Sequence, residues 1–136
     1  MQLLQVQDEE SWRAYHLIRR QVLYELRGKS GYDDMHPDEF RLGHFPLLFH
    51  QDETPVGTVR LDQRKETTVG KVRLVAVLPQ YQRQGLGTAM MNELENFAAA
   101  KGIRQLCVHA APDAIAFYRK LGWLLTENTR LTKTIG

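Results

Sequence analysis

One helical pattern dominates the first third of the chain. Between Glu9 and Arg27, large apolar side chains recur every three or four positions, at Tyr15, Ile18, Val22 and Leu26. This spacing places them on one face of an α-helix, and the glycines and serine at 28–31 end it. The polar segment 32–40 contains Pro37, so it predicts a loop or a single helical turn that starts at this proline.

Three short strands are predicted after this helix. Apolar runs occupy residues 45–50, 56–61 and 71–78. Polar turns at 52–55 and 64–68 separate them, which is typical of strands joined by short loops. Connections of this length join antiparallel neighbours, so we expect an antiparallel meander.

A longer helix begins the second half of the chain, over residues 87–101. Its apolar face is formed by Leu86, Met90, Leu94 and Phe97, and Gly102 ends it. A strand at 103–109, a short helix at 112–121 and two strands at 123–126 and 130–134 follow. The strands on either side of the long helix should run parallel. The pattern therefore predicts an α/β (α+β) fold with a mixed, mostly antiparallel central sheet flanked by helices.

Composition indicates one globular domain over residues 1–136. Hydrophobic residues make up 43% of the chain and charged residues 25%, as in ordinary globular proteins. No apolar run approaches the roughly 20 residues of a membrane span, and the N-terminus has no basic start or long apolar core typical of a secretion signal. The single cysteine, Cys107, lies in a predicted strand, where a buried, inert thiol is expected. We therefore expect a cytoplasmic protein without a membrane partner.

Charge divides unequally between the two halves. Residues 1–70 carry 12 acidic and 9 basic side chains, a net charge of −3, whereas residues 71–136 carry 4 acidic and 9 basic ones, a net charge of +5. A basic second half would favour an anionic cofactor, and an acidic first half would suit a cationic acceptor. Such asymmetry is also common in small domains without functional meaning, and both interpretations stay open.

Residues 72–88 hold the strongest chemical signal. An apolar run ends at Pro79, and the pattern Gln82-x-x-Gly85-x-Gly87 follows before the long helix. A strand, a glycine turn and a helix N-terminus together present free backbone N–H groups that bind phosphate. No lysine follows Gly87, which excludes a Walker A loop, and Met90 stands where a dinucleotide fingerprint needs a third glycine. An ordinary turn with a helix cap is the alternative.

A second motif lies about thirty residues further on. It reads Ala-Ile-Ala-Phe-Tyr-Arg-Lys-Leu-Gly-Trp over residues 114–123. The two motifs, in this order and at this separation, resemble the two signatures of the GNAT N-acetyltransferase superfamily. The resemblance covers residues 56–132. Trp123 replaces the family's usual Phe, and Ala111 replaces an Asn found in many members, which removes one polar contact to the cofactor.

The resemblance implies a fold, a cofactor and the residues that bind it. The fold is a sheet of about six to seven strands in which the two central parallel strands splay apart. The cofactor is acetyl-coenzyme A, the donor co-substrate. Its pantetheine arm would pair with the strand at 71–78, and its diphosphate would bind the turn at 82–88. The residues implied to bind the coenzyme are Val75, Ala76, Val77, Gln82, Arg83, Gln84, Gly85, Leu86, Gly87, Thr88, Phe117 and Lys120.

Tyr118 is the expected catalytic residue. The resemblance implies that it acts as general acid toward the departing thiolate, since a phenol with a pKa near 10 and a thiol with a pKa near 8.5 exchange a proton readily. Some family branches use a glutamate as base on the strand before the turn, but Lys71 and Arg73 occupy that region here. The remaining candidates for the base are a water chain and the side chains of Asp33, Asp34, His36, Asp38, Glu39 and His109.

The acceptor is expected to be a primary amine of a small molecule or peptide. Asp33, Asp34, His36 and His109 are candidates for binding it, and residues 28–49 are expected to form its pocket. A non-catalytic acyl-CoA-binding module of the same fold is the alternative function. No metal is expected, because the Asp and His spacing matches no compact ligand set. The basic residues between Arg13 and Lys29 are expected to form the solvated face of a helix rather than a nucleic-acid site. The resemblance allows a homodimer, although no residue demonstrates one.

Overall fold

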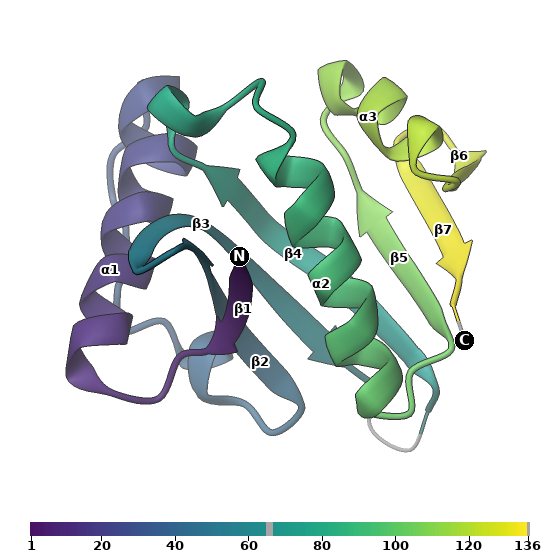
Figure 1. The fold of residues 1–136 in the computed structure, drawn as a ribbon, viewed down its shortest axis with the longest axis horizontal. Coiled ribbons are helices and arrows are strands. Elements are labelled where there is room, and N and C mark those ends of the chain that lie inside the picture. The colour runs from purple at the N-terminus through teal and green to yellow at the C-terminus, as the bar shows by residue number, and fades with distance from the viewer. Residues whose placement is uncertain (65–66, 136) are drawn as a thin grey trace.

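The sheet contains every predicted strand and one more. The structure is a computed structural model that describes residues 1–64 and 67–135; residues 65–66 of the predicted turn at 64–68, and Gly136, lie outside the described residues. The strands are arranged in the order β1-β2-β3-β4-β5-β7-β6 (Figure 1). Their bounds are β1 Gln2–Gln5, β2 His44–Gln51, β3 Thr54–Gln63, β4 Val69–Val77, β5 Gln105–His109, β6 Leu124–Glu127 and β7 Arg130–Thr134.

The predicted meander and the predicted mixed sheet are both confirmed. β2, β3 and β4 pair antiparallel in chain order, as do β5 with β7 and β6 with β7. β4 and β5 form the parallel pair. β1 was not predicted, because Gln-Leu-Leu-Gln does not alternate apolar and polar residues. It pairs antiparallel with β2 at one edge of the sheet.

The parallel pair opens into a splay, as the family resemblance implies. Pairing between β4 and β5 ends at Val72 and Val108. Beyond this point β4 continues to Val77, while β5 ends at His109 and the two strands diverge (Figure 1). Among the described residues, no strand pairs with the backbone of β4 after Val72 on the β5 side.

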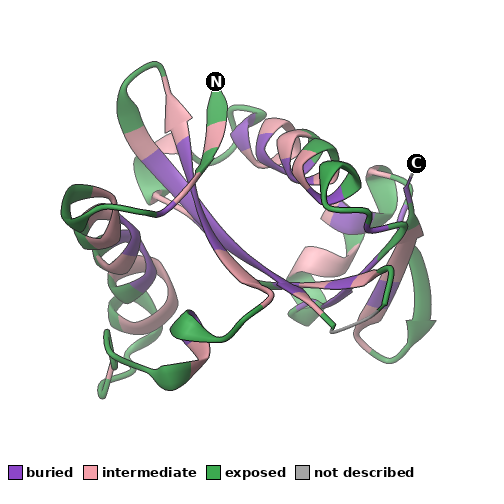
Figure 2. Cartoon of the chain, turned by 90° about the horizontal axis from the view of Figure 1, so that it is seen from below, coloured by how far each residue is buried: buried purple, intermediate pink, exposed green. Residues whose placement is uncertain are grey.

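Helices cover both faces of the sheet. On one face α1 (Glu9–Arg19) packs through Tyr15 and Ile18 against Leu48 and Ala76. On the other face α2 (Leu86–Ala100) and α3 (Ile115–Lys120) pack against the main apolar core. Figure 2 shows buried residues along the strands and on the helix sides that face the sheet. Among the described residues, no helix is both long and apolar enough to cross a membrane.

The predicted first helix is observed as three consecutive segments. Asp8 caps α1, since its side chain accepts a hydrogen bond from the Ser11 backbone N–H at 2.7 Å. The chain then continues through a π-helical turn, η1 (Arg20–Tyr24), and a 3₁₀ turn, η2 (Glu25–Arg27). Gly28 ends the helix in the left-handed conformation, with φ of 67°. This confirms the expected extent of the helix to Arg27.

Arg19 corrects the expectation that the basic residues of this helix face solvent. It is only 7% exposed and pairs with Glu39, which lies in the short turn η3 (Pro37–Phe40). Arg60 of β3 lies 3.6 Å from Glu39 and also binds Asp62 through two hydrogen bonds of 2.8 and 3.0 Å. Buried charges need such partners because desolvation is otherwise too costly. The network therefore anchors the 37–40 turn to α1 and β3.

Candidate functional site

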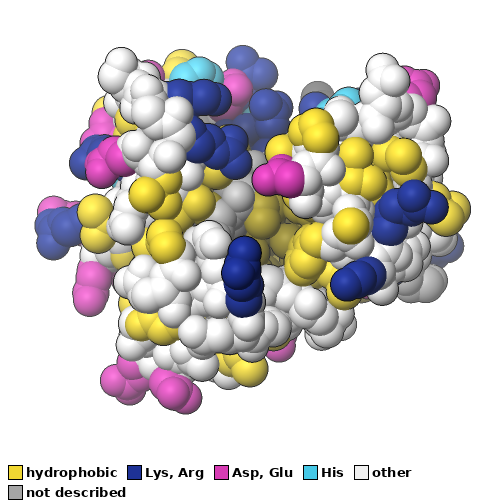
Figure 3. Space-filling model, turned by 90° about the horizontal axis from the view of Figure 1, so that it is seen from above, with side chains coloured by type: hydrophobic (Ala, Val, Ile, Leu, Met, Phe, Trp, Pro, Cys, Tyr) yellow, Lys and Arg dark blue, Asp and Glu magenta, His cyan; other side chains and the backbone are white. Residues whose placement is uncertain are grey.

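A cavity of about 1120 Å³ occupies the splay between β4 and β5. Figure 3 shows it as a hollow between two lobes, with apolar side chains inside it. Four parts of the chain form its walls: the end of the first helix, β4, the start of α2, and the segment from β5 into α3. Helices and strands from both halves of the chain thus meet at one concave site, which is the usual setting of a small-molecule site.

A bulge in β4 marks the point where the strand leaves β5. Leu74 has φ of 57°, which is uncommon for a side chain other than glycine, asparagine or aspartate. The register between β3 and β4 shifts here, so that two residues of β4 oppose one residue of β3. A bulge bends and twists the strand that carries it. The cavity thus begins where the bulge turns β4 away from its parallel neighbour.

Beyond the bulge, β4 presents backbone groups to the cavity. The Leu78 N–H donates to the Val56 carbonyl at 2.9 Å, which directs it toward β3. Backbone groups alternate in direction along a strand, so the Val77 N–H and carbonyl point away from β3 into the gap. The carbonyl accepts a hydrogen bond from Gln82 Nε2 at 2.8 Å. Gln82 therefore fixes the end of β4 to the turn that follows.

The 82–88 turn presents a row of unoccupied donors. α2 begins at Leu86 and has no side-chain cap. The first helical hydrogen bond at this end joins the Ala89 N–H to the Gly85 carbonyl. Within the described part of the chain, none of the six backbone N–H groups from residue 83 to residue 88 donates a hydrogen bond. Such donors, at the positive end of a helix dipole, favour an anion.

The two glycines of this turn have different structural roles. Gly85 adopts φ of 78° and has open space around the position of a Cβ. At Gly87, a Cβ would lie 3.3 Å from Cζ of Phe117 on α3. Gly85 is therefore needed for the shape of the turn, and Gly87 for the close approach of the two motifs.

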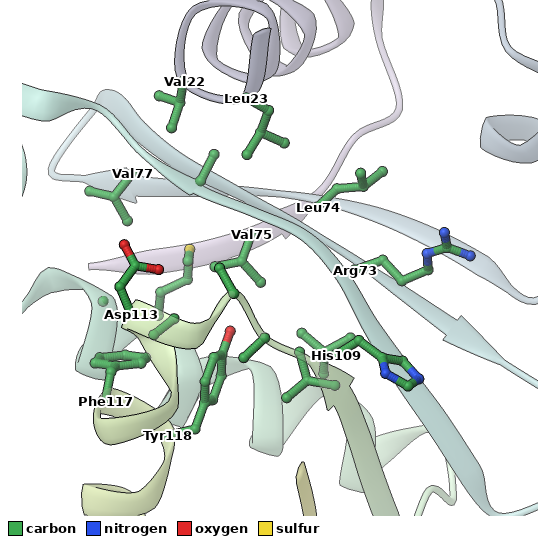
Figure 4. A pocket seen from close by; sticks show the side chains of 18 of the residues that line it. Val22, Leu23, Arg73, Leu74, Val75, Val77, His109, Asp113, Phe117 and Tyr118 are labelled. Atoms are coloured by element: carbon green, nitrogen blue, oxygen red, sulfur yellow. The ribbon is translucent and has the colours of Figure 1, made fainter. Parts of the chain in front are cut away.

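Tyr118 is held between aromatic rings at the wall of the cavity. Its ring meets Phe117 and Trp123 edge-on, with centroid distances of 5.2 and 5.3 Å. The hydroxyl points toward Val75 (Figure 4). Only 4% of the residue is exposed, and desolvation raises the pKa of its phenol to about 12. Tyr118 is therefore protonated, and able to donate, throughout the neutral range.

The raised pKa predicts a loss of stability in alkaline solution. The phenol has a pKa of about 12 in the folded protein and about 10 in the unfolded chain. Its contribution to the free energy of unfolding is therefore complete below pH 10 and is lost as the pH rises to 12. The free energy of unfolding should therefore fall by about 1.4 kcal/mol per pH unit in this window for such a tyrosine. Urea denaturation at pH 9 and pH 11.5 should show a smaller fall in the free energy of unfolding for Tyr118→Phe than for the wild type. An equal loss in both proteins would contradict the assignment.

The narrow end of the cavity is basic. Arg73 and His109 directly follow the last paired residues of β4 and β5, and Figure 4 shows both side chains at the end of the cavity away from Asp113 and Phe117. Lys71 precedes Arg73 by two positions on β4, and Arg27 and Lys29 also line the cavity. β4 itself, Val69–Val77, contains no aspartate or glutamate.

The cavity brings together many of the residues that the sequence indicated. Its lining includes Val75, Ala76, Val77, Gln82, Arg83, Gly87, His109, Phe117 and Tyr118. Other predicted cofactor contacts do not line it; these are Gln84, Gly85, Leu86, Thr88 and Lys120. Leu86 is buried, so it can offer a ligand only its backbone. The contacts of all these residues with a cofactor stay predictions.

The acidic loop lies apart from the cavity. Asp33, Asp34 and His36 are exposed and do not line it. The Asp33 side chain accepts a hydrogen bond from the Met35 backbone N–H at 2.9 Å, and His36 accepts one from the Asp38 N–H at 3.1 Å. Of the expected acceptor segment 28–49, Lys29 is the one described residue in the lining. Apart from Lys29, this segment therefore lies outside the cavity lining, and its role in binding the acceptor stays a prediction.

The corresponding wall comes from the end of the first helix. Val22, Leu23, Tyr24 and Arg27 line the cavity together with Lys29. Val22 was assigned to the apolar face of an amphipathic helix from its spacing, and Leu23 was not singled out. The π-helical turn at Arg20–Tyr24 alters this register, and the sequence contains no signal for it.

Comparison with known proteins supports the two motifs. The model of the acetyltransferase (GNAT) family matches residues 7–123. A Bacillus subtilis (strain 168) protein named as a candidate acetyltransferase is 31% identical over 127 residues, which cover 90% of this chain and 83% of that protein.

Solved structures with this fold are also similar. A candidate N-acetyltransferase from Lactobacillus plantarum superposes with a TM-score of 0.83 at 19% identity, over 99% of this chain and 98% of the other. The PaiA N-acetyltransferase from Thermoplasma acidophilum, solved in complex with coenzyme A, has a TM-score of 0.73 at 15% identity, over 98% of this chain and 99% of the other. These similarities confirm the predicted mixed fold.

Proposed function

Since this chain belongs to the acetyltransferase (GNAT) family, we propose that it transfers an acetyl group from acetyl-coenzyme A to a primary amine. The acceptor is a small molecule or an exposed peptide amine that attacks the thioester directly. The observation that carries the proposal is the row of six unoccupied N–H groups at residues 83–88, beside an open gap in the sheet. A neighbour of the same fold was solved with coenzyme A.

The coenzyme would lie along the gap with its diphosphate on the 82–88 turn. Arg83 lines the cavity and would add a positive charge to the backbone donors. The pantetheine amides would pair with the free backbone edge of β4 at Val75 to Val77, as an added strand does. The acyl end would then point toward the narrow end of the cavity. Phe117 would lie against the arm from the opposite wall.

Three steps complete the transfer. The amine nitrogen attacks the thioester carbon, and the carbonyl oxygen of the thioester becomes an oxyanion. A backbone N–H at the free edge of β4, near the Tyr118 hydroxyl, would stabilise this oxyanion. The nitrogen loses a proton to a water chain or to His109, the titratable group at the end of β5. The C–S bond then breaks, and the sulfur receives a hydrogen bond and a proton from Tyr118.

The high pKa of Tyr118 constrains this last step. Transfer from a phenol with a pKa of about 12 to a thiolate whose thiol has a pKa near 8.5 is uphill by about 5 kcal/mol. The transfer is favourable only if the proton lost by the attacking nitrogen is passed along the water chain to the phenol oxygen in the same step. Tyr118 therefore serves as a hydrogen-bond donor throughout and as a relay at the moment of cleavage.

A thiol-release assay with acetyl-coenzyme A and a panel of amines tests the proposed function. Free thiol should appear only when certain amines are present, together with the acetylated amine in the mass spectrum. Release that does not depend on any amine would contradict transfer. Tight binding of the coenzyme without release would instead support the alternative of a non-catalytic binding module.

A matched pair of glycine variants tests the role of the turn. Gly85 and Gly102 have φ values of 78° and 79°, with open space around both, at opposite ends of α2. Alanine at either position adds a similar backbone strain of about 1 kcal/mol. Gly85→Ala should raise the Kd for coenzyme A about tenfold, because it distorts the donor row, whereas Gly102→Ala should leave it unchanged. Isothermal calorimetry measures both; equal effects would argue against phosphate binding at this turn.

A further inference from the structure

The basic side chains that line the cavity outside the 82–88 turn have no carboxylate partner among the described residues. Lys71 and Arg73 come from β4, and Arg27 and Lys29 from the end of the first helix. All four line the cavity. In the part of the chain that the structure describes, none of them lies within ion-pair distance of an acidic side chain. Figure 3 shows Lys and Arg side chains gathered along one rim of the hollow.

Lys71 and Arg73 lie away from the turn that would hold the diphosphate. Val72 packs against the core on the α2 face. Because side chains alternate along a strand, Lys71 and Arg73 project on the opposite face, which α1 covers. Arg73 also precedes Val77 by four residues, or roughly 13 Å of strand. The coenzyme's phosphates would lie beyond Val77, so they would not neutralise these cations.

The buried charges behind this end of the cavity compensate one another. Arg19 and Arg60 face Glu39 and Asp62, so two guanidinium groups balance two carboxylates. Asp62 is the cross-strand partner of Lys71, but its two oxygens accept hydrogen bonds from Arg60 at 2.8 and 3.0 Å. The network therefore leaves the positive charge of the cavity uncompensated.

We infer that the amine acceptor carries a negatively charged group, a carboxylate or a phosphate, that binds to Arg73 and Lys71 at the narrow end of the cavity, with Arg27 and Lys29 adding to the positive charge of the lining. This inference rests on the proposed acetyl transfer and specifies its acceptor. Asp113, the one acidic residue of the described lining, lies at the other end of the cavity (Figure 4). An arginine near the acyl end can bind a carboxylate or phosphate through two hydrogen bonds. A cationic acceptor such as a polyamine would be repelled there, contrary to the interpretation that the acidic first half of the chain allowed.

The test compares related amines with and without an anionic group. Phosphoethanolamine is paired with ethanolamine, and β-alanine with β-alaninamide; putrescine represents the cations. In the thiol-release assay, one anionic amine should have a kcat/KM about tenfold or more above that of its neutral partner. The pair that shows this difference tells whether the acceptor's anionic group is a phosphate or a carboxylate. The preference should weaken between 50 and 500 mM salt. A preference for the neutral or cationic amine would overturn the inference while leaving acetyl transfer intact.

Arg73→Gln should abolish this preference, with Arg104→Gln as the control. Arg104 loses the same charge but lies before β5, outside the cavity lining. Arg73→Gln should leave the Kd for coenzyme A within twofold of the wild type; a parallel loss of coenzyme binding would assign the arginine to the coenzyme and overturn the inference.

If no amine is acetylated, calorimetric binding of the same amines tests whether the site prefers an anionic group. Calorimetry with the protein saturated with coenzyme A should show binding of phosphoethanolamine or β-alanine and none of the uncharged analogues. Equal binding, or none, would overturn the inference. Absence of turnover despite bound coenzyme is the separate failure of the proposed function.

Discussion

Tyr118→Phe should lower kcat for acetyl transfer by a factor of about 10² to 10³ while leaving the Kd for acetyl-coenzyme A within twofold. The substitution removes one oxygen atom and keeps the ring between Phe117 and Trp123. Packing is therefore retained, and only the hydrogen bond and proton supplied to the sulfur are lost. Steady-state thiol release gives kcat, and calorimetry gives the affinity for the coenzyme.

Tyr81→Phe is the control for this variant. Tyr81 packs against the same core but lies in the turn after β4 and does not line the cavity. It should keep wild-type kcat. If Tyr118→Phe also kept wild-type kcat, the phenol would have a packing role only, and water would have to protonate the sulfur.

Glu39→Ala should lower the free energy of unfolding by about 3–5 kcal/mol. Glu39 is 3% exposed and is shared between Arg19 and Arg60, and it also accepts a hydrogen bond from the Tyr15 hydroxyl at 3.3 Å. Its removal leaves Arg19 without a carboxylate and Arg60 with Asp62 alone. The lower free energy of unfolding therefore arises from buried positive charge that has lost its partner. Urea denaturation near neutral pH measures this loss of stability.

Glu9→Ala is the matched control for the buried carboxylate. Glu9 also pairs with an arginine, Arg13, at 3.3 Å, but the two side chains are 90% and 74% exposed. Its loss should cost under about 1 kcal/mol, as for other surface ion pairs. Similar losses in the two variants would show that burial contributes little to the network.

The positions of β2 to β7 along the chain were predictable because each of these strands carries its own local signal. Alternating or continuous apolar runs separated by turn residues indicated β2 to β5 and both C-terminal strands. The spacing of Gln82, Gly85 and Gly87 likewise indicated the turn that the structure places at the open end of the splay. These features depend on neighbours within about ten residues, which is the range over which a single sequence is informative.

The basic lining of the cavity was not predictable because it depends on tertiary arrangement. Arg27 and Lys29 are more than forty residues from Lys71 and Arg73, and each pair alone fits a solvated surface. Arg19 was misassigned for the same reason, since its partner Glu39 lies twenty residues away across an irregular loop. The left-handed Leu74 that starts the bulge also has no signature, because leucine rarely adopts this conformation.

The central claim is that main-chain N–H groups of the 82–88 turn hold the diphosphate of the coenzyme. An NMR titration of ¹⁵N-labelled protein with coenzyme A tests it most directly, with pantetheine as the phosphate-free comparison. The amide signals of residues 83–88 should shift strongly with coenzyme A and much less with pantetheine. Unchanged signals from these amides at millimolar coenzyme A, or equal shifts with both ligands, would contradict the claim.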